Sequence, residues 1–222
     1  ISKNDIDNFW NENLKKKEEK NIHSFLWLNL IDRKNEAEII QKIIRNWISK
    51  YGNYKKDIWN DNIVNKRIIA WISNSEIILN NVQKDFEEIF FESLIKQINF
   101  IKKSLKIVSH ETTKISSISA IILSGLVFKE YFNNYSMGLK ELKKIIDIHF
   151  DKDGFPKNRN SESLIIFLQY FILIKEWIKN AQEVIPDYLE EIIDKNLVCL
   201  NSFYNPSKKL PLFNGATEKN LE

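Results

Sequence analysis

The sequence is poor in cysteine, glycine and proline, and each shortage excludes a class of structure. A single cysteine, Cys199, excludes an internal disulfide and a cysteine cluster for zinc. It stands among apolar helical residues, which predicts a buried small hydrophobe. Five glycines and four prolines in 222 residues leave few of the turns that a β-rich fold needs. No stretch approaches about 18 uncharged apolar residues, so no transmembrane helix is expected.

Strong net charge and the common catalytic motifs are also missing. The 33 basic and 30 acidic residues give a net charge of +3, which is too even to indicate a nucleic-acid partner. HExxH, a glycine-rich phosphate loop, GxSxG and an EF-hand pattern are absent. His23, His110 and His149 stand far apart with no metal-ligand partner at i+3 or i+4, and His149 reads as a core or rim residue. We therefore expect no cofactor in this fragment.

What the sequence does contain is a succession of amphipathic helical patterns. Apolar residues recur at i, i+3 and i+4, and no segment alternates as a strand does. The predicted helices cover 35–52, 59–72, 75–82, 86–105, 110–132, 139–149, 164–177 and a segment introduced by Pro186. Gly52 is expected to end the first of them in a left-handed conformation. Short connections favour antiparallel pairs, so we predict an all-α fold, an incomplete (α/α) toroid of helical hairpins.

Two details of these patterns bear on packing and on domain limits. Small residues in 110–132 would let a neighbouring helix approach closely; they are Ser116, Ser117, Ser119, Ala120, Ser124 and Gly125. Residues 1–22 are polar and of mixed charge, and we interpret them as a lead-in. The helical domain is expected over 23–204, with a linker over 205–222.

The most concentrated turn signal lies at residues 151–163, DKDGFPKNRNSES. Asp153-Gly154 supplies a tight bend, and Pro156 disfavours helix before it. Lys157 and Arg159 add two cations, and Asn160 or Ser161 can cap the next helix. Such a loop can meet an anionic ligand, or it can be an ordinary solvated connection.

The aromatic residues also allow two interpretations. Trp47, Trp71 and Trp177 lie at helical spacing among aliphatic residues, which favours core packing. Trp59 lies just before a predicted helix cap, Asn60 or Asp61, where an indole can stack on the apolar face of a sugar ring. The hydroxyl groups of a sugar need polar partners. Residues of the right type are Trp59, Asn60, Arg67, Lys157, Asn158, Arg159 and Asn160.

Four blocks, in this order, resemble heparinase II/III-like proteins, which are polysaccharide lyase relatives. The blocks are SFLWLNL (24–30), WNDNIVNKRIIAWI (59–72), DGFPKNRNSESL (153–164) and PLFNGATE (211–218). The resemblance implies an N-terminal α/α toroid followed by a β-sandwich domain that is missing here. It also implies β-elimination on uronic-acid glycans such as glycosaminoglycans, in the periplasm or cell envelope of a bacterium.

The resemblance also implies site residues. His110 falls near the Asn-His region of active lyases and is the expected catalytic residue, although Ser109 stands where the asparagine is expected. Ser163 and Leu164 occupy the positions of a Tyr-His pair, and neither can take a proton. Tyr170 lies about 10 Å further along the helix. The expected substrate-binding residues are Trp59, Asn60, Arg67, Trp71, Lys157, Arg159, Asn160 and Asn214.

Three hypotheses follow for function. The chain is the toroid of a lyase that cleaves acidic polysaccharide, a module that binds such a glycan without cleaving it, or a helical scaffold with an apolar protein-binding groove. The first two imply an acidic polysaccharide and a downstream β-sandwich domain as partners, with no nucleic acid and no membrane span. A cationic hollow that contains Arg67 and Arg159 would favour them over the third.

Overall fold

The structure, a computed structural model, describes residues 10, 16–31, 36–203, 214 and 216. The chain divides into two compact units, unit 1 (Ile1–Val108) and unit 2 (Ser109–Glu222). All regular elements of the described residues are helices, and their only β-type pairing is an isolated bridge between Phe150 and Pro156. The predicted all-α class is confirmed.

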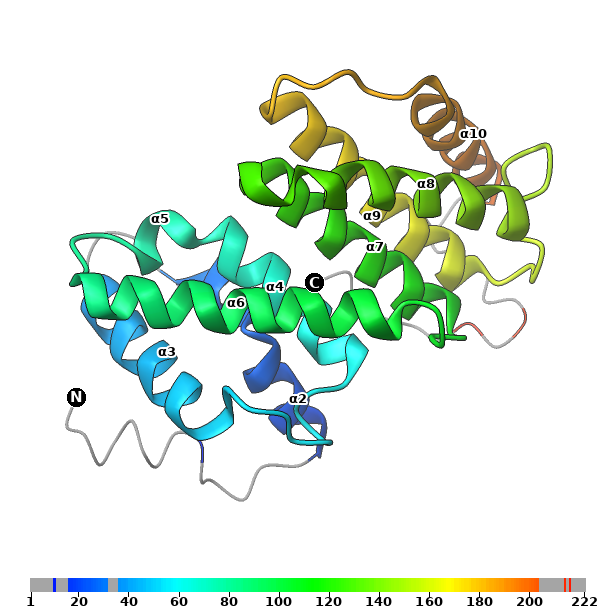
Figure 1. The fold of residues 1–222 in the computed structure, drawn as a ribbon. Helices are drawn as coiled ribbons and strands as arrows, with labels where there is room; N and C mark the ends of the chain where they lie inside the picture. Colours follow the sequence, from blue (N-terminus) through cyan, green and yellow to red (C-terminus); the bar gives the residue numbers. More distant parts are fainter. Residues whose placement is uncertain (1–9, 11–15, 32–35, 204–213, 215, 217–222) are drawn as a thin grey trace. The chain divides into compact units, whose positions relative to one another are not determined.

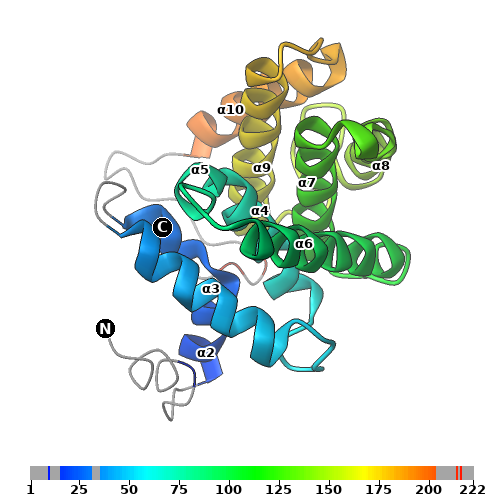
Figure 2. The same ribbon diagram turned by 60° about the vertical axis from the view of Figure 1, so that its left-hand side comes forward.

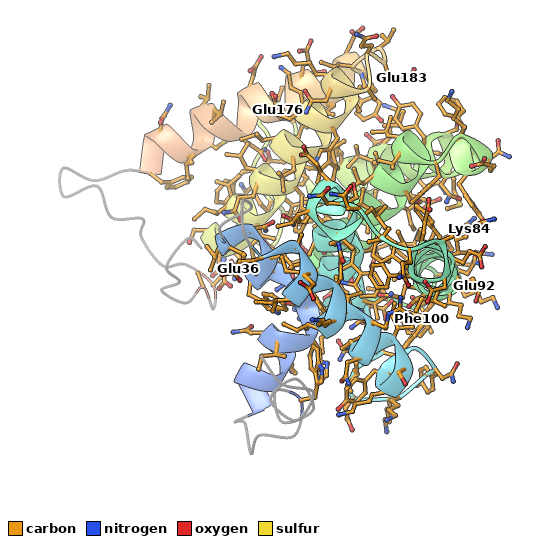
Figure 3. All side chains as sticks on the ribbon, turned by 90° about the vertical axis from the view of Figure 1, so that its left-hand side faces the viewer. Glu36, Lys84, Glu92, Phe100, Glu176 and Glu183 are labelled. Carbon is orange, nitrogen blue, oxygen red and sulfur yellow. The ribbon has the colours of Figure 1, made fainter. Side chains whose placement is uncertain are left out.

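Unit 1 consists of helices that pack around α4 and α6 (Figure 1). Its elements are α2 (Lys16–Ser24), η1 (Leu26–Leu30), α3 (Ala37–Tyr51), α4 (Asp61–Ser73), α5 (Ser75–Ile78) and α6 (Lys84–Ser104). α4 packs against α2 and α6, and α3 packs against α5 and α6. On α6, Lys84 and Glu92 are exposed and lie along its outer side in Figure 3, whereas the ring of Phe100 lies 5.6 Å from that of Trp59.

An aromatic cluster fills the core of unit 1. The rings of Trp47 and Trp71 meet edge to face at 5.5 Å, and Phe25 meets both of them at similar distances. Edge-to-face pairs place the positive edge of one ring on the negative face of another, and large aromatic rings bury much apolar area. The core-packing interpretation of Trp47 and Trp71 is therefore confirmed.

Unit 2 is built on α7, which is buried along most of its length. Its elements are α7 (Glu111–Val127), η2 (Lys129–Tyr131), α8 (Phe132–His149), α9 (Ser161–Asn180) and α10 (Asp187–Phe203). α7 packs against α8 and α9, and α10 packs against α9 and α8 (Figure 2). A Cβ at Gly125 would collide with the backbone of Tyr135 on α8, so these two helices pack closely. The close approach predicted from the small residues of this segment is confirmed.

Local sequence signals predicted two helix starts correctly and one helix end wrongly. The side-chain oxygens of Asn60 and Asn160 accept hydrogen bonds from the N–H groups of Ile63 and Ser163, so both predicted N-caps are present. Gly52, in contrast, has φ −65° and is not left-handed, because its N–H simply continues the helical pattern to the Ile48 carbonyl.

The predicted domain limits stay predictions. α2 begins at Lys16, inside the range that we interpreted as a polar lead-in. The range 205–222 lies outside the described residues except for Asn214 and Ala216. In the described part of the chain, no helix is both long enough and apolar enough to cross a bilayer.

Candidate functional site

The carboxylate of Asp151 organises the loop between α8 and α9. Its Oδ1 accepts hydrogen bonds from the N–H groups of Asp153 and Phe155, both at 3.0 Å. Its Oδ2 lies 2.8 Å from Nη1 of Arg159. Burial by itself would raise the pKa of this carboxyl, but the two N–H donors and the guanidinium outweigh it, and the net pKa is lowered. Asp151 is therefore a charged anchor for both the turn and Arg159.

α10 holds the same loop from the other side. Nδ2 of Asn196, a fully buried residue, donates to the Gly154 carbonyl oxygen at 2.6 Å. The Cys199 thiol donates to the Asp153 carbonyl oxygen at 3.2 Å, and this cysteine is only half-buried, which corrects the prediction that it is a buried hydrophobe. Gly154 has φ +80° and its missing Cβ would collide with Lys195 of α10. The loop is thus held in one conformation from both sides.

Three of the predicted site residues, Arg159, Asn160 and Asn214, lie together in unit 2. Nδ2 of Asn160 donates to the Asn214 carbonyl oxygen at 3.0 Å. In return, Nδ2 of Asn214 lies 3.2 Å from the carbonyl oxygens of Asn158 and Arg159. Arg159 and Asn214 both have positive φ, 56° and 51°. The fold thus joins two sequence blocks that resemblance alone had linked.

Arg159 and Asn214 border an open pocket of about 400 Å³. It is lined by Phe155, Arg159, Cys199, Ser202, Phe203 and Asn214. The rings of Phe155 and Phe203 lie 5.0 Å apart, and the Arg159 guanidinium carbon lies 5.2 Å from the centre of the Phe155 ring. A cation, an amide and an apolar aromatic wall therefore meet at one place.

Lys157 has a structural function that its sequence position did not reveal. Its ammonium donates to the carbonyl oxygens of Asp147 and Ile148, at 3.1 and 2.8 Å. These carbonyls belong to the last turn of α8, where a helix carries partial negative charge. Two of the three N–H donors of Lys157 are thus used within the protein, and its contact with substrate stays a prediction.

His110 is the N-cap residue of α7 and is exposed, as is Ser109. Its Nδ1 lies 3.0 Å from Oγ1 of Thr112. Ser163 and Leu164, at the positions of the expected Tyr-His pair, are both buried at the start of α9. Tyr170 on the same helix donates to Oγ of Ser116, and burial raises its pKa, which disfavours the phenolate that a base would need.

The remaining predicted site residues belong to unit 1, and two of them lie in its core. Arg67 and Trp71 are completely buried, which contradicts the expectation that they face a substrate cleft. Arg67 donates to Oε1 of Gln97 at 2.6 Å and to the His23 carbonyl oxygen at 2.9 Å, and its guanidinium carbon lies 4.2 Å from the Trp47 ring centre. Polar partners inside unit 1 therefore hold Nε and Nη1 of this arginine, whereas its buried Nη2 has no hydrogen-bond partner among the described residues.

Trp59 and Asn60 also make internal contacts. Trp59 is buried and donates from Nε1 to the Tyr51 carbonyl oxygen at 2.8 Å. Asn60 caps α4 and donates from Nδ2 to the Asp57 carbonyl oxygen at 2.8 Å. Both side chains thus stabilise the entry to α4, and their contact with a sugar stays a prediction.

Sequence reasoning missed several residues of the site. Asp151, Phe155 and Phe203 had no assigned role, and Glu111 beside His110 was passed over. The signal for Asp151 was present, because an aspartate two residues before another turn residue commonly accepts backbone N–H bonds. Phe203 gave no such signal, since only the packing of α10 brings it to the loop.

Comparison with known proteins supports the fold. No family model and no curated protein matches the sequence. Among solved structures, a mutant of the heparan sulfate lyase HepC from Pedobacter heparinus is similar with a TM-score of 0.72 at 13% identity, over 93% of this chain and 35% of that one. The non-mutant HepC matches with a TM-score of 0.65 at 14% identity, over 88% and 32%. Heparinase III matches with a TM-score of 0.68 at 18% identity, over 86% and 30%.

These likenesses bear on the fold alone, because the sequence identities are low. The chain spans about a third of the length of each of these structures. It shares the fold of the helical toroid region of heparinase III, so the predicted (α/α) toroid class is confirmed. The chain thus has a polysaccharide-lyase-like helical fold.

Proposed function

We propose that this chain is the helical domain of a polysaccharide-lyase-like protein and that unit 2 binds an acidic, uronic-acid polysaccharide. The observation that carries the proposal is that Arg159 and Asn214 line a pocket with Phe155 and Phe203, while Asn160 holds Asn214 in place. The likeness to heparan sulfate lyase structures supports the same class of ligand.

The chemistry of the pocket suits such a glycan. A sugar ring has an apolar C–H face, for which the phenylalanine rings offer a partner, and hydroxyl groups, for which amides do. A uronate carboxylate suits a guanidinium, whose paired N–H groups match its geometry. Arg159 is 56% exposed on its side chain, so it is accessible even while it contacts Asp151.

The proposal extends to the longer protein. A downstream β-sandwich domain would complete a protein of the length of its structural neighbours, of which this chain covers about a third. The bacterial envelope or periplasm is the proposed location, since acidic polysaccharides are met there. No cofactor is proposed for this chain.

Cleavage by β-elimination is the second candidate, and the likeness to lyases favours it. His110 is the proposed catalytic residue from the sequence, and its exposure at the start of α7 leaves it accessible to a substrate. The buried Ser163 and Leu164 supply no proton acceptor, so the base has to come from elsewhere in the chain.

Binding is tested by titrating uronate oligosaccharides into the full chain and into Arg159→Ala, with calorimetry as the measurement. Loss of a charge-assisted contact predicts a Kd about 10 to 100 times higher. Arg45→Ala is the matched control, because Arg45 is also exposed and lies 2.8 Å from a carboxylate, that of Asp85, but in unit 1. Equal Kd values for both variants would refute the proposed site.

Cleavage is followed in the same samples through the absorbance of the unsaturated product. Loss of product in His110→Ala with an unchanged Kd would support His110 as the catalytic residue, and product at the wild-type rate would refute that role. Binding without product in the wild type would leave the chain as a glycan-binding module.

A further inference from the structure

A histidine and a carboxylate meet in unit 2, and neither of them lines the pocket of Arg159. Nδ1 of His149, the last residue of α8, lies 3.3 Å from Oε1 of Glu111, the first residue of α7. Their side chains are 25% and 29% exposed, so the pair sits at the surface with its contact partly shielded. The sequence predicted that His149 is a core or rim residue, and the structure shows that it also pairs with a carboxylate.

Glu111 is held in place from its other oxygen. Its Oε2 accepts a hydrogen bond from Nδ2 of Asn158 at 3.0 Å, and the same Nδ2 lies 3.3 Å from Oγ of Ser163. Oδ1 of Asn158 accepts from the N–H of Asn160 at 2.9 Å. The carboxylate is thereby connected to the loop that carries Arg159 and Asn160.

This arrangement selects one form of the imidazole. A carboxylate beside Nδ1 favours a proton on Nδ1, which leaves the lone pair of the neutral ring on Nε2. Within the described part of the chain, Nε2 has no hydrogen-bond partner. A histidine oriented by a carboxylate, with the second nitrogen open, is the arrangement that a general base requires.

We propose that His149 is the proton acceptor of unit 2 and that Glu111 is its positioning residue. The proposal rests on the second candidate function, β-elimination, and supplies the base that Ser163 and Leu164 cannot. Nε2 takes the proton from the sugar carbon next to the carboxylate. The electron pair left on that carbon forms a C=C bond to the neighbouring carbon, and the bond from there to the glycosidic oxygen breaks. The departing oxygen takes the proton from the imidazolium, so the protein returns to its starting state.

The tautomer of His149 tests the geometry without any substrate. The chain has three histidines, so ¹⁵N imidazole spectra can be assigned with one histidine-to-glutamine variant each. We expect an Nδ1–H tautomer for His149 that is lost in Glu111→Gln. His23 is an internal reference of the opposite kind, because its Nδ1 accepts from Nε1 of Trp47 at 3.0 Å. An Nε2–H tautomer at His149, or no change in Glu111→Gln, would overturn the assignment.

Kinetics test the catalytic step. In the full chain, His149→Gln is expected to lower kcat on a uronate glycan about 10² to 10⁴ times with the Kd of the glycan unchanged. Glu111→Gln should lower kcat by a smaller factor, and circular dichroism checks that both variants fold. Product formation at the wild-type rate in His149→Gln overturns the proposal.

The remaining outcomes separate this proposal from the proposed function. A wild-type chain that binds the glycan and releases no product overturns the role of His149 while the binding function stands. A chain that neither binds nor cleaves overturns both.

Discussion

Nη1 of Arg67 donates a 2.9 Å hydrogen bond to the backbone carbonyl oxygen of His23, which lies 44 positions away in the chain. The guanidinium is completely buried, and burial lowers its pKa from the ordinary value of arginine to about 9, so it stays charged at neutral pH. Arg67 forms no ion pair within the described residues. Its neighbours are the His23 carbonyl, the Gln97 side-chain amide and the Trp47 ring. Cation–π and neutral hydrogen-bond partners thus stabilise a buried charge.

Arg67→Ala is predicted to lower the free energy of unfolding by about 3 kcal/mol, because it opens a cavity and leaves two buried acceptors unpaired. Arg67→Met should cost less, since it fills the space and removes the buried charge. Urea unfolding measures both, with Lys84→Met on exposed α6 surface as the control. A change within about 0.5 kcal/mol for Arg67→Ala would contradict this.

Arg67→Met also separates the core interpretation from the substrate-binding one. If Arg67 belongs to the core, the Kd for a uronate oligosaccharide should stay within about twofold of the wild type. A Kd raised tenfold in a folded variant, about 1.4 kcal/mol, would restore Arg67 as a glycan contact.

The buried His23 makes unit 1 sensitive to acid. Burial, followed by the charges of Arg67 and Lys55, lowers the pKa of His23 from 6.5 to about 4. Its Nδ1 accepts the Trp47 indole N–H, which a protonated ring could not do. The unfolded imidazole binds a proton more readily than the folded one. This contribution to stability is therefore complete above pH 6.5 and declines as the pH falls towards 4, by up to about 3 kcal/mol.

Unfolding measured between pH 7 and pH 4 checks this dependence. His23→Gln should flatten the curve, because it removes the group whose pKa differs between the folded and the unfolded state. In Arg67→Met the decline should be smaller and should end at a higher pH, because one of the charges that lower the pKa of folded His23 is gone.

The side chain of Asn160 makes two different contacts, and two substitutions can distinguish their effects. Its oxygen caps α9 and its Nδ2 contacts the Asn214 carbonyl oxygen. Asn160→Ala should lose both and cost about 1 kcal/mol of stability, whereas Asn160→Ser keeps a cap and loses only the contact. We expect Asn160→Ser to unfold like the wild type in urea but to shift the Asn214 side-chain amide signals in NMR spectra. An unshifted Asn214 amide would refute the contact.

The loop before α9 depends on α10 for its conformation. Asn196→Ala removes the buried donor to the Gly154 carbonyl and should cost about 1–3 kcal/mol, measured by urea unfolding. Gly154→Ala should cost a similar amount, because its φ of +80° is strained for alanine and Lys195 occupies the space of a Cβ. The exposed Asp194→Ala on the same helix is the control. Wild-type stability in Asn196→Ala would mean that α10 does not hold the loop.

The sequence predicted the helices of this protein better than it predicted the residues of its site. Most helical segments and the caps at Asn60 and Asn160 were predicted correctly, because each signal acts within about four residues of the chain. The predicted helix over 110–132 was wrong at its end, since α7 stops at Val127 and α8 already begins at Phe132. The conformation of Gly52 was wrong, since a glycine permits a left-handed ending without requiring it. Arg159, Asn160 and Asn214 were named from resemblance, and the fold brought them together.

The sequence by itself determined that the chain is helical, where most helices begin, and which residues could carry charge or stack. Only the tertiary structure decided which polar side chains are buried and which pairs meet. Arg67 lies in the core because Gln97 and the His23 backbone, both remote in sequence, supply its partners. His149 on α8 pairs with Glu111 on α7, a contact that only the packing of the two helices creates. Periodicity and capping are properties of neighbours along the chain, whereas burial and pairing arise from packing between helices.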